Sequence, residues 1–348
     1  NEVSGAAIDW GENTGSSFHS LRVLRVDGTL RPLPDADEPT LELALYEVLS
    51  ASARRDENAP KGFVLTGEIA PERVNATLRD FDVRSWLPGA APTSIRPLLA
   101  DLAIEGSVSE IGFSLEGAEL ERVSAVAQLD DVAVTLPLSQ DDEPGEGLRL
   151  SRSSGSIRIE QRQLVANLRG DLADVPLEVD FQADVSDLLE GRGAESNMPY
   201  TARIVIDKFS FGQQSRVLPF LPADTREVLA RFADQNQIGA ISPSAEVAAE
   251  VNLSGRLAGG AGGFGSAVLQ TYRGIVRIDR CATAFYEFPY QFENVTGTIE
   301  FNQDRLIIRS LSGVAESGAV LSASGLVKPL RAAAGFDLEV EVFDMPID

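Results

Sequence analysis

The sequence predicts a mostly β fold, in which repeated antiparallel strands form an elongated, curled β-sheet groove with short connector helices. Three observations support this prediction: apolar and polar residues alternate along many short runs, turn residues separate these runs, and one block of sequence recurs. Strict alternation gives a strand one apolar and one solvated face. Strands that follow one another at short spacing pair as antiparallel meanders.

The alternating runs define the predicted strands. In residues 104–108, 245–255 and 299–301, apolar side chains alternate with polar or charged ones. Residues 336–342 alternate apolar and acidic side chains without an error. The run Asn302-Gln303-Asp304 is typical of the turns between such strands. Each run is therefore predicted as a strand with one apolar face.

Two segments do not alternate, and we expect them to form the connector helices. These are residues 84–102 and 216–235, and the second is the better helix because its apolar side chains recur at helical spacing. In the second segment, Asp224 can cap the helix and Glu227 stands three residues later. Residues 40–53 fit either a helix or a strand, because their leucines also alternate.

An internal repeat organises the chain. Residues 154–165 align without a gap with residues 296–307, and Gly155 matches Gly297. Both copies are preceded by a connector segment with an aromatic-Leu-Pro motif. The repeat predicts three units: a partial N-terminal β repeat (1–83) and two β-groove repeats, each with a connector helix (84–215 and 216–348).

The alternation also predicts which residues line the groove. A linear array of strands grows lengthwise and leaves an apolar face that must be covered, and acyl chains would cover it. The candidate lipid-contact residues are Val247, Val251, Leu253, Val276, Ile278, Ile299, Phe301, Leu306, Ile308, Leu338 and Val340. Packing in an ordinary sheet core requires the same alternation, so core packing is the alternative role for each of them.

Charge and composition exclude several functions. The chain has 53 acidic against 30 basic residues, a net charge of −23 that repels nucleic-acid phosphates. No run of eighteen apolar residues is present, and the sequence begins at Asn1 without a signal-peptide pattern. We therefore expect a fragment whose targeting segment lies outside it, with no nucleic-acid partner.

The residue inventory offers little for catalysis or cofactor binding. The single histidine, His19, has no partner motif for a catalytic triad or a zinc site, and Cys281 lies in a strand pattern typical of a core residue. Residues 260–265 fit G-x-G-x-x-G but lead into a strand, which indicates an interstrand loop. The acidic turn at 141–146 lacks EF-hand spacing, although its oxygen atoms suit Ca²⁺. We expect no enzyme activity, no cofactor and no catalytic or metal site.

Four segments carry a resemblance to a known family. They are residues 272–279, 288–301 (FPYQFENVTGTIEF), 304–308 and 318–325, and the connector at 217–222 (VLPFLP) accompanies them. Together they resemble the C-terminal repeat of the AsmA-like superfamily, of the AsmA, TamB and YhdP type. The resemblance spans residues 205–348 and extends more weakly over 100–190.

The resemblance implies a function and a place in the cell. Members are repeating β-groove, bridge-like lipid transfer proteins of the periplasm, anchored to the inner membrane by an N-terminal segment that would lie outside this fragment. It implies that phospholipid or another acyl lipid is carried or shielded in the groove, with inner- and outer-membrane components at the ends of the intact protein. The alternative is a structural or scaffolding envelope protein, involved in outer-membrane assembly without lipid cargo.

Overall fold

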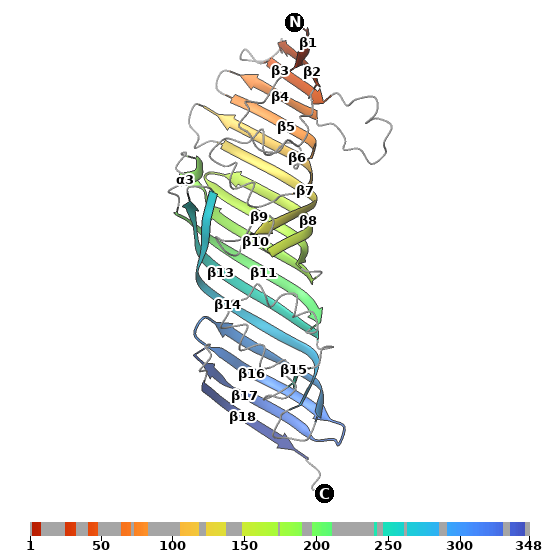
Figure 1. Cartoon of the computed structure of the whole chain (residues 1–348), viewed down its shortest axis with the longest axis vertical. Helices are drawn as coiled ribbons and strands as arrows, with labels where there is room; N and C mark the ends of the chain where they lie inside the picture. The colour runs from red at the N-terminus through yellow and green to blue at the C-terminus, as the bar shows by residue number, and fades with distance from the viewer. Residues whose placement is uncertain are drawn as a thin grey trace, which may run out of the picture.

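The strands of the protein form one long antiparallel sheet (Figure 1). The computed structural model describes residues 2–7, 25–32, 41–47, 64–70, 73–82, 105–117, 123–136, 148–172, 175–189, 197–210, 240–241, 246–260, 263–284, 291–329 and 335–344. Within these residues the sheet has 18 strands. The predicted mostly β, groove-like fold is confirmed, because the sheet is curled and its two ends, β1 and β18, lie far apart.

The N-terminal part of the sheet is a meander in chain order. Its strands are β1 (Glu2–Ala7), β2 (Arg25–Pro32), β3 (Leu41–Glu47), β4 (Val64–Ala70), β5 (Arg73–Asp82), β6 (Glu105–Glu116), β7 (Val123–Leu136), β8 (Leu148–Glu160), β9 (Gln163–Leu172) and β10 (Val175–Asp184). Each strand pairs antiparallel with the next one along the chain.

The C-terminal part continues the same sheet. It contains β11 (Asn197–Ser210), β12 (Ala240–Ile241), β13 (Glu246–Gly260), β14 (Gly263–Ala284), β15 (Gln291–Asn302), β16 (Leu306–Ala315), β17 (Val320–Lys328) and β18 (Gly335–Phe343). The short β12 and the longer β13 pair with successive parts of β14, and β11 pairs with β13 directly. Hydrogen-bonded strand pairs therefore cross both predicted unit boundaries, at β5–β6 and at β11–β13.

Helices contribute little to the described part of the chain. The one helix there is the short α3 (Ser186–Leu189), which follows β10 and was not predicted. Of residues 40–53 the structure describes 41–47, which form strand β3, so the strand interpretation is right for that part and the helix is wrong there. The predicted connector helices at 84–102 and 216–235 lie outside the described residues. None of the helices that the structure describes is long and apolar enough to cross a membrane.

The sequence repeat corresponds to two equivalent hairpins, β8–β9 and β15–β16. Each first strand has a β-bulge three positions before the matched glycine, where Arg152 (φ 50°) and Asn294 (φ 51°) adopt the left-handed conformation. A Cβ on Gly155 or Gly297 would lie 2.1 or 2.2 Å from a carbonyl oxygen of the next strand. The repeat is thus a structural repeat, with its bulge and its close backbone approach at the same positions.

Bulges recur along the sheet and bend its strands. They interrupt the register between β6 and β7, between β7 and β8, and between most neighbouring strands from β11 to β17. An extra residue in one strand increases the local twist and turns the strand away from a flat path. A packed cluster lies beside this bend in the C-terminal part; its members are Ile278, Cys281, Phe292, Val295, Ala315, Ala319 and Leu321.

Candidate functional site

The candidate site is the apolar face of the sheet. Directly paired residues on neighbouring antiparallel strands point to the same face, so the register identifies which side chains lie together. One row of paired residues contains only apolar side chains and glycine from β6 to β17; it runs through Val108, Leu129, Gly155, Leu168, Val179, Ile204, Val251, Gly274, Phe301, Leu306 and Val327. The row crosses the 215/216 unit boundary without a polar interruption.

Three further apolar rows lie on the same face. One runs from β4 to β14 through Leu65, Leu78, Ile111, Ala127, Ile157, Ala166, Phe181, Ala202, Leu253 and Tyr272. The other two run from β11 to β18: Ile206, Ala249, Val276, Ile299, Ile308, Gly325 and Leu338, and then Phe209, Val247, Ile278, Gly297, Leu311, Ala323 and Val340. Every residue predicted to line the groove belongs to one of these four rows.

Burial divides the predicted groove residues into three groups. Val247 and Ile278 are buried, with 3% and 9% of their surface exposed. Leu338 and Val340, on the terminal strand β18, are each 39% exposed. The others are half-buried: Val251, Leu253, Val276, Ile299, Phe301, Leu306 and Ile308. The half-buried group has apolar surface still available for a ligand, whereas the buried pair already packs against the protein.

Aromatic side chains fill the spaces above glycine on this face. A Cβ added to Gly274 would lie 2.4 Å from the Phe301 ring, so that ring covers the glycine of the neighbouring strand. The Tyr272 ring is tilted against Phe301, with their centroids 6.2 Å apart. On β10 and β11, Phe181 stacks on Tyr200 at 5.7 Å. Alternation found Phe301, but it did not find this second aromatic pair.

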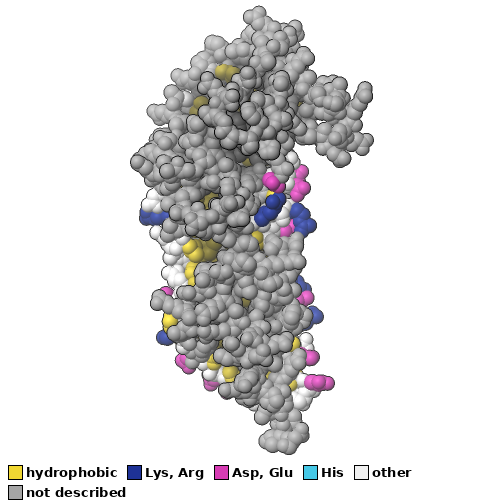
Figure 2. All heavy atoms as spheres, in the orientation of Figure 1, with side chains coloured by type: hydrophobic (Ala, Val, Ile, Leu, Met, Phe, Trp, Pro, Cys, Tyr) yellow, Lys and Arg dark blue, Asp and Glu magenta, His cyan; other side chains and the backbone are white. Residues whose placement is uncertain are grey.

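Figure 2 views the molecule in the orientation of Figure 1. Hydrophobic side chains are visible in the middle of this view, and charged side chains gather at its margins. The margins therefore carry much of the charge that is visible in this view.

The opposite face of the sheet is polar and is held by cross-strand ion pairs. Arg79 pairs with Glu110 at 3.1 Å and Arg169 with Glu178 at 2.8 Å, each directly across a strand pair. Such exposed pairs add little stability individually. They show which face of the sheet contacts water, because their charged side chains alternate along the strands with those of the apolar rows.

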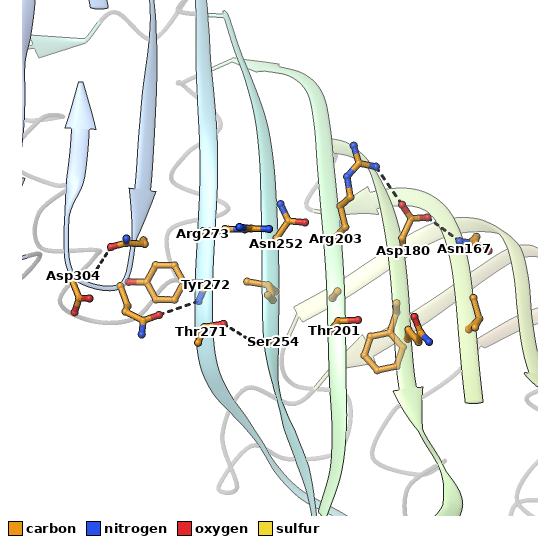
Figure 3. A pocket seen from close by; sticks show the side chains of 17 residues that line it. Asn167, Asp180, Thr201, Arg203, Asn252, Ser254, Thr271, Tyr272, Arg273 and Asp304 are labelled. Carbon is orange, nitrogen blue, oxygen red and sulfur yellow. Dashed lines mark hydrogen bonds and ion pairs between the residues drawn. The ribbon is translucent and has the colours of Figure 1, made fainter. Parts of the chain in front are cut away.

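A shallow polar trough of about 760 Å³ crosses this face from β9 to the β15–β16 turn (Figure 3). Asn167 donates to Asp180 at 2.9 Å, and Asp180 pairs with Arg203 on β11 at 3.4 Å. Ser254 and Thr271 share a hydrogen bond of 2.6 Å between β13 and β14. The trough side chains thus bond largely to one another.

The ion pairs shift the pKa values of the groups that form them. A hydrogen bond from Arg203 at 2.8 Å, followed by its charge, lowers the pKa of Glu250, and the same contact raises the pKa of Arg203. Arg309 acts likewise on Glu300. These shifts stabilise the charged forms, which is the opposite of the shift that a general acid needs near neutral pH.

The structure tests several of the predicted chemical features. Cys281 is buried in β14, and burial raises the pKa of its thiol to about 11, as expected of a core cysteine rather than a nucleophile. The predicted interstrand loop at 260–265 is shorter than expected, because Gly260 ends β13 and residues 263–265 begin β14, while residues 261–262 lie outside the described residues. Among the described residues, no group of three or more side chains could hold a metal ion. His19 and the acidic turn at 141–146 lie outside these residues.

Comparisons with known proteins found no match. No protein-family model matches the chain, and neither a curated protein nor a solved structure matches it.

Proposed function

We propose that this chain is a lipid-carrying or lipid-shielding segment, in which acyl chains lie along the apolar face of the sheet. The observation that supports this proposal best is the continuity of the apolar rows. The row through Val251 and Phe301 contains no polar side chain from β6 to β17. An acyl chain is uncharged and flexible, so a surface without polar interruptions suits it.

The partial burial of the row residues also supports a ligand on this face. Seven predicted groove residues keep part of their apolar surface exposed, whereas a sheet core would bury it. Each square ångström of apolar surface removed from water contributes about 25 cal/mol. Covering these residues would therefore stabilise a bound acyl chain and the sheet together.

The wider proposal follows the resemblance to AsmA-like proteins. On this view, the chain is part of a periplasmic envelope protein that is anchored to the inner membrane through another segment. Its cargo is phospholipid or another acyl lipid, and membrane components contact the ends of the intact protein. We assign the chain no catalytic activity and no cofactor.

The first test is to recover lipid and locate it on the sheet. The purified chain would be analysed by native mass spectrometry and organic extraction, with a photo-crosslinking residue at Phe301. The matched control places the same probe at Thr298, which lies in the same strand on the opposite face. We expect lipid in the extract, and crosslinks from position 301 that exceed those from position 298 at least five-fold.

A substitution pair provides the second test. Ile307 and Ile308 are neighbours in β16 and both are half-buried, but they point to opposite faces. Ile308→Glu should lower the recovered lipid several-fold, because it buries a carboxylate against the acyl chain. Ile307→Glu should leave the recovered lipid within about two-fold of the wild type. A lipid-free protein, or equal losses in both folded variants, would refute the proposal and favour the scaffolding alternative.

A further inference from the structure

A fifth apolar row lies on the groove face, beside the row that ends at Tyr272 and on the side away from Phe301. Directly paired residues carry it from β4 to β13, and its members are Gly67, Ala76, Phe113, Ala125, Ile159, Leu164, Ala183, Tyr200 and Gly255. Tyr200 is the one member of this row whose side chain contains a polar atom. Its hydroxyl is therefore a hydrogen-bonding group on an otherwise apolar stretch of the groove face.

The register and an aromatic contact place the Tyr200 ring on this face. Strand β11 lies inside the sheet (Figure 1), and Tyr200 is directly opposite Ala183 of β10 and Gly255 of β13. The ring stacks on Phe181, a member of the neighbouring apolar row, with the centroids 5.7 Å and the planes 20° apart. The stack fixes the ring, and the two small residues opposite Tyr200 leave space beside it for a ligand group.

The Tyr200 hydroxyl has no hydrogen-bond partner among the residues that the structure describes. The residue is half-buried, and burial raises the pKa of its hydroxyl, which therefore stays protonated and can donate at neutral pH. Tyrosine hydroxyls on apolar surfaces usually find a partner, because a hydroxyl that is removed from water without one costs free energy. A ligand on this face would supply the missing acceptor.

The surroundings of the hydroxyl favour an uncharged acceptor. The nearest positions on the groove face hold Phe181, Ala183, Ala202, Leu253 and Gly255. None of these residues could neutralise a phosphate or a carboxylate, and a charge that is buried without a partner is costly. An ester carbonyl oxygen is uncharged and accepts a hydrogen bond from a hydroxyl. In a glycerolipid it is also the first polar group at the end of each acyl chain.

Tyr200 lies near the rim of the groove. Strand β11 begins at Asn197, which is exposed, whereas Met198 is only 3% exposed. Three residues of a strand span about 10 Å, so the hydroxyl lies about that far along the strand from solvent. A lipid with an ester carbonyl at Tyr200 could therefore keep its headgroup in water at the Asn197 rim, while its acyl chains cover the apolar rows.

We propose that the Tyr200 hydroxyl donates a hydrogen bond to an ester carbonyl oxygen of the bound lipid. Tyr200 then selects lipids whose acyl chains are ester-linked, and it fixes where the polar end of the lipid lies. The ligand class is an ester-linked glycerolipid rather than an ether lipid or a hydrocarbon. This inference rests on the proposed lipid-carrying function and adds to it the residue that recognises the lipid.

The first experiment compares two lipids that differ only in how their chains are linked. The probes are a diester phosphatidylcholine and its diether analogue, which lacks the carbonyl oxygens. Both lipids are zwitterionic, so the net charge of −23 acts on them alike. Each is titrated into the full chain, and native mass spectrometry measures the bound fraction. The wild type should bind the diester lipid about two- to ten-fold more tightly, which is the net contribution of one hydrogen bond.

Two substitutions in neighbouring residues of β11 locate the hydrogen bond. Tyr200→Phe removes the hydroxyl and keeps the ring that stacks on Phe181. It should bind the diester lipid about two- to ten-fold more weakly, with little change for the diether lipid. The matched control is Thr201→Val, which removes a hydroxyl from the opposite face of the sheet. This variant should keep the preference of the wild type for the diester lipid.

Infrared spectroscopy gives a readout that a loss of packing would not change. The diester lipid is isotopically labelled at its ester carbonyls, whose stretching frequency falls when they accept a hydrogen bond. The bound lipid should show a low-frequency carbonyl component with the wild type and with Thr201→Val. That component should be lost with Tyr200→Phe.

The outcomes separate this inference from the function on which it rests. Equal affinity of the wild type for the diester and diether lipids would overturn the role of Tyr200, and so would an equal loss of both lipids in Tyr200→Phe. Lipid would still be bound in either case, so the lipid-carrying function would stand. If the wild type binds neither lipid, the lipid-carrying function is refuted and the role of Tyr200 with it.

Discussion

Two buried positions in the repeat have equivalent backbones and different side chains. Ser153 in β8 and Val295 in β15 each lie two residues before the matched glycine and next to the bulge. Each packs on a glycine of the following strand: Ser153 Oγ lies 2.7 Å from where a Cβ of Gly170 would stand, and Val295 Cγ2 lies 2.6 Å from that of Gly313. The serine is fully buried, and its hydroxyl has no hydrogen-bond partner among the residues that the structure describes.

The exchange of these side chains should have opposite effects on stability. A buried hydroxyl without a partner costs about 1–3 kcal/mol, so Ser153→Ala should stabilise the fold by about 1 kcal/mol. Ser153→Val should stabilise it by about 1–2 kcal/mol, because the equivalent position already accommodates valine against glycine. Val295→Ser removes buried methyl groups and adds an unpaired hydroxyl. It should therefore destabilise the fold by about 2–4 kcal/mol.

The assay must resolve stability locally, because repeat arrays often unfold in parts. Hydrogen exchange of the β8–β9 and β15–β16 amides at increasing urea gives an opening free energy for each hairpin. The substitutions at position 153 should shift the first hairpin, and Val295→Ser should shift the second. A loss of 1 kcal/mol or more in Ser153→Ala would refute the reasoning, because it would mean that the hydroxyl makes a hydrogen bond.

Three further predictions concern backbone strain, pH and thiol reactivity. Gly155 has φ 139° and no room for a Cβ, so Gly155→Ala should destabilise the fold by about 3 kcal/mol or prevent folding. The control is Gly112→Ala, because the nearest atom to a Cβ added at Gly112 is 4.0 Å away. Its stability in urea unfolding should stay within about 1 kcal/mol of the wild type. Hydrogen bonds from the Ser186 hydroxyl and backbone N–H lower the pKa of Asp184 from its usual value of 3.8. The stability that these bonds contribute is therefore present above pH 3.8 and is lost as the pH falls through the lowered pKa. Ser186→Ala should raise the pKa of Asp184 in an NMR titration. The pKa of Cys281 is raised from 9.0 to about 11. At pH 8 its thiol should therefore react with a disulfide reagent about two orders of magnitude more slowly than in the urea-unfolded chain. Unfolding measurements should also show the stability of the fold falling between pH 9 and about 11.

Alternation in the sequence predicted the faces of the strands but not their bulges. Val251 and Phe301 share a face, as expected, because both pair directly with Gly274 of β14, which lies between their strands. Ile278 and Cys281 are three residues apart, which strict alternation places on opposite faces, yet both belong to one packed cluster. The register shift between them in the β14–β15 pair explains this. Nothing in the local sequence marks that shift.

The alternation of apolar and polar residues also could not predict how deeply each groove residue is buried. Val247 and Val340 occupy the same apolar row, but one is 3% exposed and the other 39%. The difference arises from their places in the sheet, since β13 lies between β11 and β14, whereas β18 pairs only with β17 among the described strands. Alternation describes one strand at a time, whereas burial depends on what the neighbouring strands and the covering segments contribute. The half-buried residues of the rows are therefore better candidates for lipid contact than the buried residues or the exposed residues of β18.

Because the rows of apolar side chains are unbroken, the lipid proposal and the scaffolding alternative predict different effects of a charge placed on this face. A bound acyl chain that contacts Val251 would meet Phe301 and then Leu306 without crossing a polar side chain, so it could move along the row with little change in free energy. A charge on this face, as in Ile308→Glu in the adjacent row, would repel an acyl chain that lies there and lower the recovered lipid several-fold. A scaffold with a dry, packed face would instead lose stability around the substituted strand. Lipid content and local hydrogen exchange, measured on the same variant, therefore separate the two functions.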